Sequence, residues 1–100
     1  MAKILVAESS DKALKIITTY LQEKSHEVFI VKNKENLHEI IDSVKLDIGI
    51  IDVNFQGVSA IDILNIILDN KKNSSIQIIV STYGKNTCFI FLTKILVLIF

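Results

Sequence analysis

Short apolar runs alternate with segments of helical period along most of this sequence. Residues 4–7 form a continuous apolar run of strand length. Residues 28–31 and 48–51 are similar runs, and residues 76–80 form a further run in which Gln77 is the one polar residue. Runs without polar alternation are typical of strands that are buried on both faces of a parallel sheet. The pattern therefore predicts four strands, of which the first is buried on both faces of the sheet.

The three segments between these runs carry apolar residues three or four positions apart, which predicts amphipathic helices. Ser9, Ser10 and Asn33 precede the first two segments and are side chains of the kind that cap helix N-termini. The apolar positions are Ala13, Leu14, Ile17, Tyr20 and Leu21, then Leu37, Ile40, Ile41 and Val44, then Ile61, Leu64, Ile67 and Leu68.

Strands that alternate with helices at these spacings form repeated βαβ units. The predicted fold is therefore an α/β sandwich of three layers, with a parallel sheet between two layers of helices. We expect the four strands in the order 2-1-3-4, which places the ends of the first and third strands side by side. A chain of 100 residues leaves room for one domain, covering residues 1–100.

Composition narrows the classes of function. Eleven lysines balance eleven acidic residues, and arginine is absent. A neutral chain without a basic surface argues against nucleic acid and anionic membranes as partners. The single cysteine, Cys88, cannot form an internal disulfide, and Glu8 interrupts the N-terminal apolar run too early for a signal peptide. We expect a cytoplasmic protein.

The carboxyl ends of the predicted strands carry the candidate chemistry. Glu8 and Ser9 follow the first strand, Asp52 follows the third, and Ser81 and Thr82 follow the fourth. Two neighbouring carboxylates repel one another unless a cation lies between them, so Mg²⁺ is the natural complement. A carboxylate beside such an ion can act as a nucleophile toward phosphorus.

These residues resemble those of a known family. Residues 3–8, the stretch 47–57 with its aspartate and glycine-containing loop, and residues 78–82 are together similar to the receiver domain of two-component response regulators. The resemblance covers about residues 3–82. It implies a flavodoxin-like fold and a role as a phosphorelay signal transduction module.

The resemblance also implies a role for each site residue. Asp52 is expected to accept the phosphoryl group, and the Thr82 hydroxyl to move toward it. Glu8, Asp52 and the backbone carbonyl of Asn54 are expected to hold Mg²⁺, with Ser9 contributing through a water molecule. The implied partners are a sensor histidine kinase or phosphotransfer protein and a downstream protein. The chain is not expected to be an enzyme, because its first strand-to-helix turn has no glycine to hold a nucleotide phosphate.

Several positions depart from the family pattern. Ser9 stands where a second acid is usual, which weakens the expected Mg²⁺ site. Gln56 stands where proline is common, Ala60 where glycine is common, and Tyr83 where a small residue is usual. These departures keep a second hypothesis open, in which the chain is a pseudo-receiver that acts through protein contacts or dimerisation without phosphorylation.

The last thirteen residues lose the alternating pattern. In residues 88–100 only Thr93 and Lys94 are not apolar. Three interpretations stay open: a helix that begins near Thr87, an antiparallel edge strand, or sequence outside the native reading frame. A strand at residues 89–94 in the family's fifth position would leave too short a parallel crossover. The apolar excess predicts a homo-oligomer.

Overall fold

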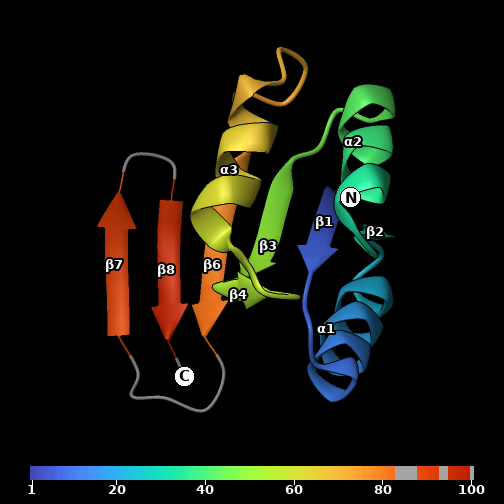
Figure 1. Ribbon diagram of the computed structural model, residues 1–100. Helices are drawn as coiled ribbons and strands as arrows, with labels where there is room; N and C mark the ends of the chain where they lie inside the picture. The colour runs from blue at the N-terminus through green and yellow to red at the C-terminus, as the bar shows by residue number, and fades with distance from the viewer. Residues whose placement is uncertain (83–87, 93–94, 100) are drawn as a thin grey trace.

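The computed structural model describes residues 1–82, 88–92 and 95–99 (Figure 1). Its elements are β1 (Lys3–Ala7), α1 (Asp11–Glu23), β2 (Glu27–Ile30), α2 (Lys34–Ser43), β3 (Ile48–Asp52), β4 (Asn54–Phe55), β5 (Val58–Ser59), α3 (Ala60–Asp69), β6 (Gln77–Thr82), β7 (Cys88–Leu92) and β8 (Ile95–Ile99). Ser10 and Asn33 cap α1 and α2 as expected, and Ser59 caps α3. None of the helices in these ranges is long and apolar enough to cross a membrane.

The main sheet has the order β2-β1-β3-β6-β8-β7. β1 pairs in parallel with β2 and β3, and β3 pairs in parallel with β6. The predicted order of the first four strands is therefore confirmed, as is the α/β fold class. Strand order reverses direction at β1, and right-handed crossovers then place α1 on one face of the sheet and α2 and α3 on the other.

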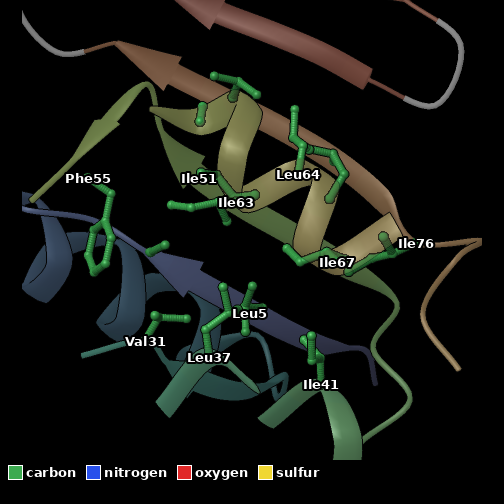
Figure 2. Close-up of a cluster of buried hydrophobic side chains, with 14 of the residues drawn as sticks. Leu5, Val31, Leu37, Ile41, Ile51, Phe55, Ile63, Leu64, Ile67 and Ile76 are labelled. Atoms are coloured by element: carbon green, nitrogen blue, oxygen red, sulfur yellow. The ribbon is translucent and has the colours of Figure 1, made fainter. Parts of the chain in front are cut away.

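The largest group of buried side chains lies between the sheet and helices α2 and α3 (Figure 2). Leu5 and Ile51 face this layer from the two central strands, and Leu37 and Ile67 meet them from the helices. Ile4 and Val6, which alternate with Leu5, are also buried but lie outside this cluster. β1 is therefore buried on both faces, as its continuous apolar run predicted.

Two residues of the predicted helix stripes are exposed instead. Tyr20 of α1 is 58% exposed, and the Lys24 ammonium lies 5.6 Å from the centre of its ring. Ile61 of α3 is 64% exposed, because the buried stripe of this helix starts one residue earlier, at Ala60, and continues through Ile63 and Leu64. Both predictions were wrong because each residue lies just outside the arc that its helix turns toward the sheet.

One buried polar side chain joins three segments of the fold. Asn73, which is 1% exposed, lies in the connection between α3 and β6. Its Oδ1 accepts a hydrogen bond from the Leu46 N–H at 2.7 Å, and its Nδ2 donates to the carbonyls of Ile41 and Val44 at 2.8 and 3.0 Å. The end of α2, the segment before β3 and the entry to β6 are therefore held by one amide group.

The last two strands decide between the interpretations of the C-terminal segment. β8 lies in parallel beside β6, and β7 pairs antiparallel with β8 at the edge of the sheet. The predicted alternative of an antiparallel edge strand is therefore found in β7, and the alternative of a helix there is wrong. The fifth position is filled by β8, and residues 83–94 give the crossover the length that a parallel connection needs. The departure at Tyr83 lies outside the described residues.

Candidate functional site

Strand register brings Glu8 and Asp52 to the same edge of the sheet. Ala7 pairs with Ile51 in the parallel ladder of β1 and β3, so the next residue on each strand is one of the two acids. Each follows an apolar run, so the register places the two acids side by side at the carboxyl ends of β1 and β3. The two carboxyl groups interact directly with each other. The predicted convergence of the two acids is found in the structure.

Glu8 is a buried carboxyl group with a raised pKa. Its side chain is 9% exposed, and Oε2 accepts a hydrogen bond from the Ser10 N–H at 3.1 Å. Burial is the largest cause that raises the pKa of Glu8 above its usual value, and the charge of Asp52 and a hydrogen bond with it add to this effect. The backbone N–H groups of Ser10 and Ser9 act in the opposite direction. The negative charge of the two carboxyl groups is thus only partly compensated by these two backbone N–H groups.

Ser9 links Asp52 to the loop that follows it. The Ser9 N–H donates to Asp52 Oδ2 at 3.3 Å, and Ser9 Oγ accepts a hydrogen bond from the Gln56 N–H at 3.1 Å. Ser9 is exposed, and its hydroxyl takes part in a contact between two protein loops. The sequence did not indicate that Ser9 would connect these two loops.

The loop after Asp52 is a small β-hairpin made of β4 and β5. Phe55 pairs with Val58, so Gln56 and Gly57 are the two residues of the turn, with φ of 52° and 77°. Positive φ at both central residues is the mark of a type I′ turn, which glycine adopts without strain. Phe55 is 4% exposed and anchors the hairpin in the core (Figure 2). The Gln56 Nε2 group donates to the Lys32 carbonyl at 2.9 Å.

The remaining predicted site residues lie on neighbouring elements. Ser81 pairs with Asp52 in the ladder of β3 and β6, and Thr82 is the last residue of β6, one position farther along. Asn54 begins β4 and pairs with Ser59. The backbone therefore brings all three positions to the same end of the sheet as Glu8 and Asp52.

The residues at this edge fit a hard divalent cation by ligand type. Mg²⁺ is commonly held by one or two carboxylates, with water and substrate phosphate as the other ligands, and Glu8 and Asp52 supply two carboxylates. Within the described ranges, no group of three or more Asp, Glu, His or Cys side chains could hold a metal ion. Because Ser9 replaces a third acid, the charge available for an ion is that of two carboxylates.

The similarity of this chain to known proteins lies in its structure. No protein-family model matches the sequence, and no curated protein matches it significantly. Solved structures do match. A response regulator receiver domain protein from Bacillus halodurans is 14% identical, with a TM-score of 0.78, and the match covers 98% of this chain and 83% of that one.

Two further solved structures carry ligands. The receiver domain of a sensor histidine kinase from Pseudomonas aeruginosa, with a magnesium ion coordinated in its active site cleft, is 16% identical with a TM-score of 0.73, over 83% of this chain and 68% of that one. The response regulator TrrA from Thermotoga maritima, in complex with Mg²⁺ and BeF, is 25% identical with a TM-score of 0.70, over 85% and 72%. The likeness to receiver domains predicted from the sequence is confirmed: the chain has the receiver-domain fold.

Proposed function

We propose that this protein is a phosphorelay module that accepts a phosphoryl group on Asp52. The observation that carries the proposal is the adjacency of Glu8 and Asp52, whose carboxyl groups interact at the edge of the sheet where α/β proteins bind ligands. Burial is the main cause of the raised pKa of Glu8, and the charge of Asp52 beside it adds to the effect. Such a site favours a cation and the reactions that a cation assists.

The chemistry is a phosphoryl transfer to a carboxylate. An Asp52 oxygen attacks phosphorus, the bond between phosphorus and the donor's leaving group breaks, and the donor departs with that bond's electron pair. Mg²⁺ held by Glu8 and Asp52, with the backbone carbonyl of Asn54 as a further ligand, supplies charge neutralisation for the phosphoryl oxygens. The Ser9 N–H fixes one Asp52 oxygen, and we assign the Thr82 hydroxyl to the phosphoryl group once it is bound.

A histidine kinase or phosphotransfer protein is the partner that we propose as phosphoryl donor. TrrA has been solved in complex with the histidine kinase ThkA, in a structure 26% identical to this chain with a TM-score of 0.68. Exposed apolar side chains offer a surface for such a donor: Val53 follows Asp52 directly, and Ile16 and Tyr20 lie one turn apart on α1, the helix that begins after the Glu8 loop. We assign this surface to contact with the donor. Output would then go to a separate downstream protein.

A small phosphodonor tests the site without any partner. With Mg²⁺ and acetyl phosphate, we expect one base-labile phosphoryl group per chain, measured by intact mass. Asp52→Asn abolishes the label because an amide is not a nucleophile at neutral pH. Asp69→Asn, which changes an exposed acid of α3, and Ile16→Lys, which alters only the proposed docking surface, keep the label.

The pseudo-receiver is the second candidate, and the Ser9 contact favours it. The position of a second acid carries a hydroxyl that accepts a hydrogen bond from the Gln56 N–H. Ser9→Asp returns a negative charge to the site and is expected to increase labelling several-fold. If Ser9→Asp keeps its fold and takes no label, the phosphorelay proposal is wrong, and the protein acts through its contacts alone.

We also propose that the protein forms a homo-oligomer through its C-terminal strands. β7 ends the sheet, and β8 is its one neighbour in the described part of the chain. The sequence of β7, residues 88–92, contains no charge and no proline, the two features that most often protect an edge strand from pairing. A second copy of this edge is the partner that fits it best.

A further inference from the structure

Gln56 is the point at which three loops of the site meet. Its N–H donates to Ser9 Oγ in the loop after β1, at 3.1 Å. Its side-chain Nε2 donates to the Lys32 carbonyl in the loop after β2, at 2.9 Å. Gln56 itself belongs to the turn that follows Asp52 and β3. One residue therefore connects the carboxyl ends of three strands, and we call Ser9, Lys32 and Gln56 the loop clasp.

The backbone of Gln56 explains why this residue type matters. Its φ of 52° lies in the left-handed region, which proline cannot adopt because its ring holds φ near −65°. Proline also lacks the N–H that donates to Ser9. A positive φ is unfavourable for glutamine too, and here its two hydrogen bonds offset that cost. The two departures at positions 9 and 56 thus form a single contact, a hydroxyl acceptor facing an amide donor.

We infer that Gln56 is a positioning residue whose clasp holds the loops around Asp52 together without a metal ion. Ser9 contacts both sides of the site, because its N–H donates to Asp52 and its hydroxyl accepts from Gln56. Loosening the clasp therefore loosens the support of the Asp52 carboxylate. The two hydrogen bonds of Gln56 use Ser9 Oγ and the Lys32 carbonyl as acceptors and no carboxylate, so they do not depend on the groups assigned to the ion.

The clasp goes beyond the proposed phosphorylation, since it holds whether or not Asp52 takes a phosphoryl group. It predicts that the turn is equally ordered with and without Mg²⁺. A site whose loops depend on the ion behaves in the opposite way, with a turn that becomes ordered only when the ion binds. The two cases differ in one measurable quantity, the hydrogen exchange rate of the Gln56 amide.

Amide hydrogen exchange by NMR on the full chain tests the clasp. We expect the Gln56 N–H to be protected in the absence of Mg²⁺ and its rate to change less than about twofold when MgCl₂ is added. Ser9→Ala removes the acceptor and raises the rate about tenfold, the effect of losing one hydrogen bond. Ser9→Thr restores a hydroxyl and brings the rate back. Gln56→Met keeps the turn residue's length but loses the bond to Lys32, and it also raises the rate.

The hydrogen exchange test has its own control, and the outcomes that contradict it differ from those of the phosphorylation test. Thr18→Ala removes a hydroxyl from the exposed face of α1, where Oγ1 donates to the Lys15 carbonyl at 3.2 Å, and leaves Gln56 exchange unchanged. An unprotected Gln56 amide in the natural sequence overturns the inference. So does protection that appears only with Mg²⁺, or a Ser9→Ala rate equal to that of the natural sequence. Loss of the Asp52 label alone overturns only the proposed function.

Discussion

The two ends of the sheet are built in different ways. In the main sheet, a helix connects β1 to β2, β2 to β3 and β3 to β6, and these helices cover the strands they connect (Figure 1). In the described part of the chain, β6 is followed by β7 and β8, and no helix is found between these strands. In Figure 1, no helix of the described ranges lies over β7 or β8.

This difference has a physical consequence for each end. Parallel strands are stable when helices cover both faces of the sheet, and β1 meets that condition with buried residues on both faces. β8 is also parallel to its neighbour β6, but it lies outside the helix layers. The first region can keep its apolar residues from water within one chain. The pairing with another chain proposed above would cover the second region.

The largest effect we expect is on assembly. Ile90→Lys places a charge in the middle of β7, which discourages edge pairing, and should reduce the mass in solution from that of an oligomer to that of a monomer. Deletion of residues 88–100 should have the same effect if the fold survives. Light scattering after size exclusion gives the mass, and far-UV circular dichroism reports the fold.

Ile61→Lys is the matched control for assembly. It introduces the same charge at a side chain that is already 64% exposed, on α3, and should leave the mass unchanged. A natural chain that runs as a monomer contradicts the proposed oligomer. A deletion variant that unfolds indicates that β8 is part of the core of one chain.

A smaller effect is expected inside the helix-covered region, at Asn73. Asn73→Ala leaves the buried Leu46 N–H without its acceptor and removes two donors to the end of α2. We expect the free energy of unfolding to fall by about 2–3 kcal/mol, measured by urea denaturation. Asn65→Ala, at an exposed position of α3, should change it by less than about 0.5 kcal/mol. If Asn73→Ala lowers the free energy of unfolding only slightly, water replaces the amide group as the hydrogen-bond partner of these backbone groups.

The covered region was also the part that the sequence predicted well. The apolar runs at residues 4–7 and 48–51 form neighbouring strands; residues 4–7 are all buried, and in 48–51 buried residues alternate with half-buried ones. Once these two strands are neighbours, Glu8 and Asp52 have to meet, since each is the first residue past a matched register. The hydrophobic pattern and the strand order together therefore predict both the fold and the adjacency of the two acids.

Other features do not follow from the pattern. The clasp depends on a positive φ at Gln56 and on two hydrogen bonds between residues distant in sequence, and neither leaves a periodic signal. Asn73 reads as one polar residue in a polar loop, although its side chain is buried. For residues 88–92 and 95–99, a strand and a buried helix have the same apolar composition, and the pairings of β8 with β6 and of β7 with β8 distinguish them.

The smallest effect that we expect is a change in the free energy of unfolding at Glu8, a buried carboxyl group with a raised pKa. Because burial raises the pKa of Glu8, ionising its carboxyl costs folding free energy. Below the ordinary pKa of the unfolded chain the carboxyl is protonated in both states, and the cost is absent. As the pH rises through the ordinary pKa toward the raised one, the cost grows, and above the raised pKa it is complete. Glu8→Gln should therefore be more stable than the natural sequence at pH 7, by on the order of 1 kcal/mol or less.

Urea denaturation of both proteins at pH 3.5 and pH 7, without and with MgCl₂, checks this prediction. The advantage of Glu8→Gln should vanish at the lower pH, because both side chains are then neutral. Mg²⁺ should stabilise the natural sequence more than the variant, since the variant loses one of two carboxylate ligands. Glu27→Gln, at an exposed residue of β2, serves as the control and should show neither trend. If Mg²⁺ stabilises Glu8→Gln and the natural sequence equally, Glu8 is not a ligand of the ion. The negative charge of Glu8 would then be compensated by the backbone N–H groups of Ser9 and Ser10 alone.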